Sequence, residues 1–214
     1  MNREELVAKI VSKVASFFKE GDFINLGIGI PTKVANFIPK GLSVILQSEN
    51  GMLKMGGMPR GKEEDERVKN ASGEFSSILE GGMFYDSAFS FGLIRGGHID
   101  ITVLGGLEVD EGANLANWII PNKFVPGMGG AMDLVNGAKM VIVAMEHCTK
   151  DGGAKILKRC TLPLTGRKCV DKIVTELAVF DFIGGKLTLT QLQEGVSLDE
   201  VKSKTEASFE VKLG

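Results

Sequence analysis

The stretch Phe23-Ile24-Asn25-Leu26-Gly27-Ile28-Gly29-Ile30-Pro31-Thr32 decides the fold class. Its first four residues are typical of a short buried strand, and Pro31 suits the first turn of a helix that continues to Phe37. An apolar run over residues 43–47 predicts the next strand. Strand, glycine turn, helix and strand form a βαβ unit. The sequence therefore predicts an open α/β sheet, mostly parallel, in which two strand ends meet at one crevice.

Glu49 follows the second predicted strand, at the point where the chain turns. Ligands of open α/β sheets bind beside such strand ends. A desolvated carboxylate there is able to attack an activated carbonyl group as a covalent nucleophile. The alternative is a turn glutamate that faces solvent, and the segment alone leaves both interpretations open.

A second candidate site is the run Gly127-Met128-Gly129-Gly130-Ala131-Met132-Asp133. Glycines expose backbone N–H groups, which form anion nests or oxyanion holes. The run is not a dinucleotide fingerprint, because Met132 stands at the third glycine position, and it is not a P-loop, because no Gly-Lys-Ser/Thr follows. A purely structural tight turn fits the same residues.

The remaining pattern predicts one domain over residues 1–214, with helices on both faces of the sheet and an antiparallel C-terminal portion. An amphipathic helix begins with a capping box at Asn2 and Glu5 and ends at Gly21. The segment from Met52 to about Ser72 is predicted as a solvated loop. Further elements are predicted as a helix over 87–95, strands over 99–104, 118–120 and 139–145, a hairpin of 174–183 with 186–190 around Gly184-Gly185, a helix after Ser197 and a strand over 208–211.

Composition excludes several classes of function. The chain has 214 residues, 43% of them hydrophobic, and a net charge of −2, which gives no electrostatic footprint for nucleic acid. The apolar runs are too short to span a bilayer and the first residues lack a signal peptide, so we expect cytoplasmic residence. Three cysteines without CxxC spacing, and the separated His98 and His147, predict neither a disulfide framework nor a metal site. Met52, Met55 and Met58 fit either loose packing under a surface loop or a flexible apolar lining of a ligand channel.

Several segments together resemble one family. They are Asn25-Leu26-Gly27-Ile28-Gly29, Ser48-Glu49-Asn50-Gly51, Leu93-Ile94-Arg95-Gly96-Gly97-His98, Ala116-Asn117-Trp118 and Gly127-Met128-Gly129-Gly130-Ala131-Met132-Asp133. In this order they closely resemble the β subunit of family I CoA-transferases of the 3-oxoacid and acetate/butyrate–acetoacetate type. The resemblance runs from about Asp22 to about Val211 and is weakest from Lys54 to Glu74.

The resemblance implies a role for each matching residue. Glu49 matches the nucleophilic glutamate, which forms an acyl-glutamyl anhydride and then a glutamyl-CoA thioester in a ping-pong exchange. Gly130 matches the glycine whose N–H serves the oxyanion hole. Asn25 matches an asparagine close to the nucleophile. Contacts with substrate or CoA are expected from the residues around these three: Gly27, Gly29, Ser48, Asn50, Gly127, Met128, Gly129 and Ala131.

The resemblance also implies a partner and leaves alternatives. A CoA-transferase α subunit would complete the site in an α₂β₂ heterotetramer, with the second oxyanion donor coming from that subunit. No metal or cofactor is expected beyond the substrate coenzyme A. An acyl-CoA hydrolase of the same fold would admit water to Glu49. A noncatalytic sensor of CoA or a sugar phosphate would need the glycine loops but not Glu49. The preferred acid stays open among acetate, butyrate, succinate and acetoacetate.

Overall fold

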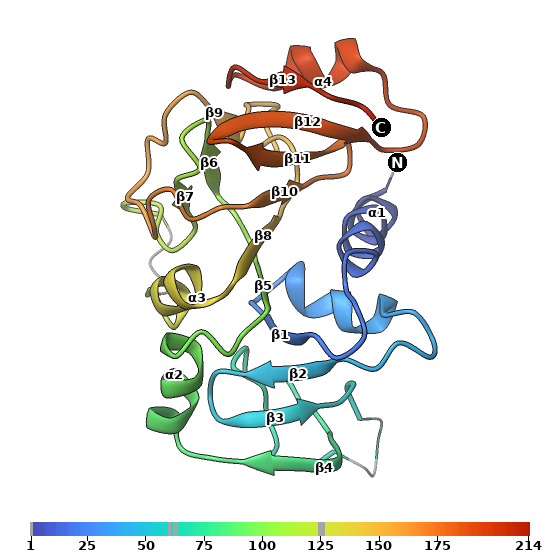
Figure 1. Ribbon diagram of the computed structural model, residues 1–214, viewed down its shortest axis with the longest axis vertical. Coiled ribbons are helices and arrows are strands. Elements are labelled where there is room, and N and C mark those ends of the chain that lie inside the picture. Colours follow the sequence, from blue (N-terminus) through green and yellow to red (C-terminus); the bar gives the residue numbers. More distant parts are fainter. Residues whose placement is uncertain (1, 60, 62–63, 124–126) are drawn as a thin grey trace.

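The computed structural model describes residues 2–59, 61, 64–123 and 127–214. Its main feature is a ten-stranded sheet with the order β13-β12-β11-β10-β8-β5-β1-β2-β3-β4, which runs along the long axis of the molecule (Figure 1). The five central strands are parallel: β10 (Lys172–Val174), β8 (Met140–Ala144), β5 (Ile101–Leu104), β1 (Phe23–Leu26) and β2 (Ile45–Ser48). The predicted open, mostly parallel α/β sheet is confirmed.

Antiparallel strands extend this centre at both ends. The C-terminal end contains β11 (Ala178–Ile183), β12 (Lys186–Leu192) and the short β13 (Glu210–Val211), of which β13 runs parallel to β12. The other end contains β3 (Met52–Met55) and β4 (Ile78–Phe84). A separate small sheet pairs β6 (Glu108–Asp110) with β7 (Leu115–Ala116) and β9 (Ile156–Leu157). The sequence predicted the C-terminal hairpin but neither β3–β4 nor the small sheet.

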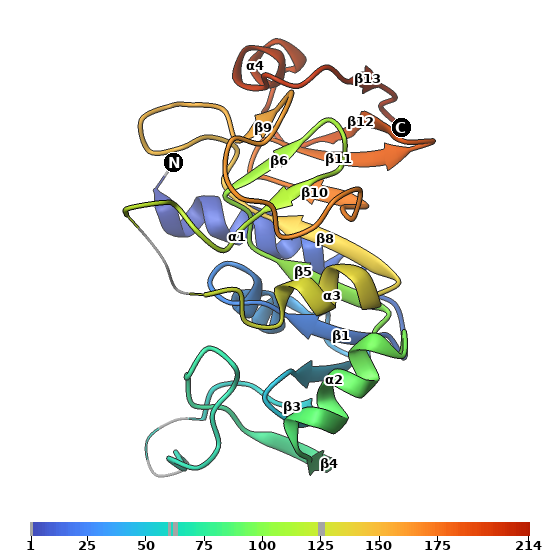
Figure 2. The same ribbon diagram turned by 90° about the vertical axis from the view of Figure 1, so that its left-hand side faces the viewer.

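Helices cover both faces of the sheet (Figures 1 and 2). One face carries α1 (Arg3–Ala15) and the 3₁₀ helix η1 (Pro31–Phe37), and the other carries α2 (Ser87–Arg95) and α3 (Ala131–Gly137). The fourth α-helix, α4 (Leu198–Lys204), lies near β12 and β13. Side chains alternate across each strand, so Ile24 and Leu46 join the core under α1, whereas Asn25 and Gln47 face α2.

Four predicted segments differ from the structure for identifiable reasons. Helix α1 has the predicted Asn2–Glu5 capping box but ends at Ala15, because Phe17 and Phe18 turn to pack on the core and Gly21 lies in the following turn. Residues 118–120 are not a strand: β7 (Leu115–Ala116) ends just before them, and the N–H of the next residue, Asn117, donates to Thr165 Oγ1.

The other two segments are the strand predicted over residues 174–183 and the loop predicted from Met52 to about Ser72. Thr175 Oγ1 accepts from Leu177 N–H and Ala178 N–H, which reverses the chain and splits 174–183 into β10 and β11. Met52 and Met55 are buried in β3, so both have the packing role, whereas Met58 is 65% exposed. Part of the charged run in this predicted loop, residues 62–63, lies outside the described residues.

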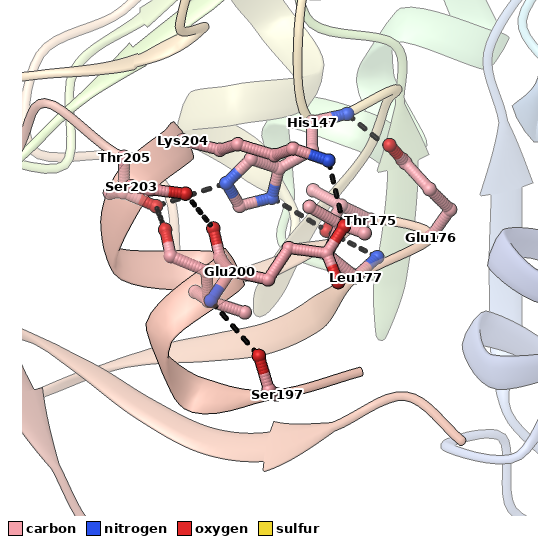
Figure 3. Close-up of polar contacts among 10 residues, drawn as sticks. His147, Thr175, Glu176, Leu177, Ser197, Glu200, Ser203, Lys204 and Thr205 are labelled. Carbon is pink, nitrogen blue, oxygen red and sulfur yellow. Dashed lines mark hydrogen bonds and ion pairs between the residues drawn. The ribbon is translucent and has the colours of Figure 1, made fainter. Parts of the chain in front are cut away.

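His147 is fully buried beside β10 and α4, in the network drawn in Figure 3. Its Nδ1 lies 3.0 Å from Thr175 Oγ1 and its Nε2 lies 2.9 Å from Thr205 Oγ1. The Thr205 hydroxyl donates to Val201 O, so it accepts from Nε2–H of a neutral imidazole. Burial and, secondarily, the Lys204 charge lower the pKa of His147 to about 4. The histidine is therefore a structural group at neutral pH.

Acid is expected to weaken the fold through His147. The unfolded state binds a proton near pH 6.5 and the folded state only near pH 4, so stability present above pH 6.5 is lost as the pH falls toward 4. The loss between pH 7 and 5 should be about 2 kcal/mol. Urea unfolding at the two pH values should show a smaller loss in His147→Gln than in the native chain. His98→Gln, at the exposed histidine, is the control; an undiminished loss in His147→Gln would contradict the assignment.

Candidate active site

The candidate active site is a cavity of about 360 Å³ at the carboxyl ends of β1 and β5. Residues from five segments of the chain line it, and most are small or apolar: Gly27, Ile28, Glu49, Leu104, Gly105, Gly106, Leu107, Asn117, Trp118, Gly127, Met128, Gly129, Gly130, Ala131 and Leu134. Among these only Glu49 carries a charge. Its carboxylate is therefore the one ionisable group that the described walls present to the cavity.

A tight hairpin turn positions Glu49. Strand β2 ends at Ser48, which pairs with Met52 of β3, and Glu49 is the first residue of the connecting turn. Gly51 has φ +114°, and a Cβ there would lie 1.9 Å from the Tyr85 carbonyl oxygen. Only glycine fits this close approach. The turn thus fixes the carboxylate at the cavity edge.

The Glu49 carboxylate faces the glycine loop. Gly130 N–H donates to Glu49 Oε1 at 3.2 Å, and Gly130 is the N-cap residue of α3. A Cβ on Gly130 would lie 2.9 Å from Glu49 Oε1 and 3.2 Å from Phe91 Cε1. The glycine therefore allows a contact between backbone and carboxylate that a side chain would obstruct.

Burial raises the pKa of Glu49 above the usual range. The Gly130 N–H and the Asn25 amide oppose this rise by favouring the anion, and the negative charge of Asp133 adds to it. A carboxylate in these surroundings is incompletely solvated and retains nucleophilic character. The site can therefore attack an electrophilic carbonyl, and a backbone N–H is already aimed at the reacting region.

The predicted site residues fall into two groups. The cavity brings together Glu49, Gly27, Gly130 and its neighbours Gly127, Met128, Gly129 and Ala131. Asn25 is buried beside this group. Ser48, Asn50 and Gly29 do not line the cavity: Ser48 Oγ accepts from Ala71 N–H, and Asn50 Nδ2 donates to Lys69 O.

Gly29 lines a separate hollow with Arg3 and Lys33. The contacts of Ser48 and Asn50 hold residues 69–71 against the hairpin. Substrate contact by Ser48, Asn50 and Gly29 stays a prediction.

Sequence reasoning missed the loop Gly105-Gly106-Leu107. It follows β5, whose carboxyl end lies beside that of β1, so the rule that indicated Glu49 also applied here. A Cβ on Gly106 would lie 2.7 Å from Met145 Sδ. Asn117 Nδ2 donates to Gly105 O at 3.1 Å and so fixes this wall. Among the described residues, no group of three or more His, Cys, Asp or Glu side chains is arranged to hold a metal ion.

An open, mostly parallel sheet with a carboxylate at its carboxyl edge, facing a glycine-rich loop, is the arrangement of this α/β protein. A family model described as coenzyme A transferase matches residues 7–204, and the chain belongs to that family. Within it the chain is of the β-subunit type of the acetate and succinyl-CoA:3-ketoacid enzymes.

Two relatives illustrate this membership. The chain is 57% identical to the β subunit of the acetate CoA-transferase of Escherichia coli K12 over 203 residues, which are 95% of this chain and 93% of the relative. It is 53% identical to the corresponding subunit of the succinyl-CoA:3-ketoacid coenzyme A transferase of Helicobacter pylori 26695, over 95% of this chain and 98% of the relative.

The crystal structure of the acyl-CoA transferase YdiF from Escherichia coli O157:H7 shares the fold. The TM-score is 0.76 at 22% identity, and the match covers 96% of this chain but 42% of YdiF. The chain thus corresponds to less than half of that polypeptide. Within the described residues, no helix has both the length and the apolar character needed to cross a bilayer.

Proposed function

We propose that this chain is the β subunit of an enzyme that moves CoA between an acyl-CoA and a short-chain carboxylic or 3-oxo acid. The observation that carries the proposal is the partly buried Glu49 carboxylate in a cavity wall, 3.2 Å from the Gly130 N–H. Family membership and the names of the relatives, acetate CoA-transferase and succinyl-CoA:3-ketoacid coenzyme A transferase, support the substrate class.

The proposed route runs through two covalent intermediates on Glu49. The carboxylate attacks the thioester carbonyl and CoA thiolate leaves, which gives an acyl-glutamyl anhydride. The thiolate then attacks the glutamyl carbonyl and the first acid leaves as a carboxylate. An acceptor carboxylate reverses both steps and leaves as its CoA ester, which regenerates Glu49. Thioester is exchanged for thioester, so the proposal requires no ATP, metal or cofactor besides coenzyme A.

An acceptor-acid panel tests the proposal. The chain, co-expressed with its α subunit, should consume an acyl-CoA only when acetate, butyrate, succinate or acetoacetate is added. Thioester loss that is independent of added acid would indicate the acyl-CoA hydrolase. Ligand binding without exchange, unchanged in Glu49→Ala, would indicate the noncatalytic sensor.

Turnover is expected only when the chain is combined with an α subunit. Gly130 supplies one N–H at Glu49, and the second oxyanion donor is expected from the partner. Ile28 is 69% exposed and Met128 is 41% exposed at the cavity, which suits a surface that a partner covers. Light scattering alongside an exchange assay should show an α₂β₂ assembly with activity. Full turnover by the isolated chain would refute this expectation. Cytoplasmic residence stays a prediction of the sequence.

A further inference from the structure

A buried chain of three polar side chains lies beside Glu49. Asn25 and Gln47 are register partners on β1 and β2. Asn25 Nδ2 donates to Gln47 Oε1 at 2.7 Å, and Gln47 Nε2 donates to Ser90 Oγ of α2 at 2.8 Å. All three residues are 0% exposed. Polar groups removed from water in this way are costly unless they are paired, so their arrangement is informative.

The pleat of the sheet connects this chain to the nucleophile. Gln47 on β2 points toward α2, where its Nε2 donates to Ser90 Oγ, and Glu49, in the turn after β2, meets the N-terminus of α3 on the same face of the sheet. Asn25 lies in register with Gln47 on the neighbouring strand. Its amide lowers the pKa of Glu49, against the effect of burial. Within the described residues, no hydrogen bond of normal geometry joins Asn25 to the carboxylate.

Gln47 Oε1 and the Glu49 anion both favour one orientation of the Asn25 amide, with Nδ2 rather than Oδ1 directed toward them. Rotating that amide by half a turn would place its oxygen against Gln47 Oε1 at 2.7 Å, which would oppose two acceptors. The Glu49 anion selects the same orientation, because an amide oxygen turned toward it would be repelled. In the observed orientation Asn25 Oδ1 is buried without a hydrogen-bond partner among the described residues. The network thus pairs one hydrogen of the donor end firmly with Gln47 Oε1 and leaves the acceptor end unpaired.

We infer that Gln47, held by Ser90, is a positioning residue that turns the Asn25 Nδ2 group toward Glu49 and so keeps the nucleophile anionic and correctly placed. Asn25 Nδ2 carries two hydrogens. One is bound by Gln47 Oε1. The second has only a long contact of 3.4 Å with the Gln47 backbone oxygen, and in this proposal it is the hydrogen that the Glu49 carboxylate accepts. The inference deepens the proposed function and rests on it for its kinetic consequences.

The other charged groups at Glu49 are on α3 and α2. Asp133 of α3 raises the pKa of Glu49, and Arg95 of α2 forms an ion pair with Asp133 at 2.6 Å. Neither contacts the chain of Asn25, Gln47 and Ser90. Loss of the positioning residue should therefore change the Glu49 ionisation without disturbing this ion pair.

Gln47→Met and Ser90→Ala test the inference in the complex with the α subunit. With Asn25 released, the pKa of Glu49 rises, so the acidic limb of the kcat profile should move to higher pH. We expect kcat to fall about ten- to a hundred-fold with KM little changed. The two substitutions act through one chain, so their combined effect should be smaller than the product of the separate effects.

A matched control and a second readout keep the outcomes distinct. Gln193 is also buried, and its Nε2 donates to Thr175 O near the far end of the sheet, so Gln193→Met should leave kcat and the pH profile unchanged. A ¹³C titration of the Glu49 carboxyl in the folded chain reads its pKa whether or not CoA is transferred. An upward shift in Gln47→Met supports the positioning role.

A folded Gln47→Met with native titration and profile would overturn the inference, as would equal changes in Gln193→Met. If Gln47→Met does not fold, Ser90→Ala, which keeps Gln47, gives the same readouts and decides the question. Failure of the native complex to exchange CoA would count against the proposed function alone.

Discussion

Glu49→Gln will abolish CoA exchange, with an expected loss of at least about 10⁴-fold in turnover. The amide is nearly isosteric with the carboxylate but cannot attack a thioester carbonyl, so neither the anhydride nor the glutamyl thioester forms. The measurement is an exchange assay on the reconstituted enzyme, combined with mass analysis after acyl-CoA is added without an acceptor acid. The native peptide containing Glu49 should carry a CoA adduct and the variant peptide should not.

The control is Glu194→Gln, an exposed glutamate outside the cavity, which should keep native turnover and the Glu49 adduct. A CoA adduct on another residue, or a Glu49→Gln enzyme with substantial activity, would remove the covalent role from this residue.

Gly130→Ala should reduce turnover by about 100- to 1,000-fold, the usual effect of losing one oxyanion donor. The added Cβ would lie 2.9 Å from Glu49 Oε1 and 3.0 Å from its Cδ. Either the carboxylate or the backbone N–H must then shift, so the donor no longer points at the reacting oxygen. The assay measures kcat for exchange in an enzyme whose assembly is verified by size.

Gly92→Ala is the matched control on neighbouring helix α2. A Cβ on Gly92 would meet no atom within 4 Å, so turnover should be unchanged. A correctly assembled Gly130→Ala enzyme with native kcat would show that the N–H of this residue is not an oxyanion donor.

Local pattern was sufficient to predict the parallel centre of the fold. Strong local signals come from the glycine turn at Gly27 and Gly29 and from the continuous apolar runs of β5 and β8. Because parallel strands of one sheet end at one edge, these signals also predict where the strand ends meet. The run over 52–55 lacks such a signal. Met52-Leu53-Lys54-Met55 lies between glycine-rich segments, and its strand character comes from pairing with β2 and β4, which are tertiary contacts that the sequence pattern does not report.

The site was predictable to the same extent. Glu49 and the loop from Gly127 to Ala131 carry local signals, and the cavity unites them. Gln47 and Ser90 carry none, because a glutamine in an apolar strand and a serine in a short helix acquire their roles only when β2 and α2 pack together. The contacts of Ser48 and Asn50 with residues 69–71 likewise depend on long-range packing.

The hairpin turn that presents Glu49 also makes the length of this segment of the chain intolerant of change. Gln47 of β2 and Glu49 of the turn lie on the α2–α3 side of the sheet, while Leu46 belongs to the core on the other side, so one inserted or deleted residue before the turn would exchange the two faces. The nucleophile would then point toward α1, away from the glycine loop. The number of residues between the paired part of β2 and the turn is therefore fixed by the position of the nucleophile.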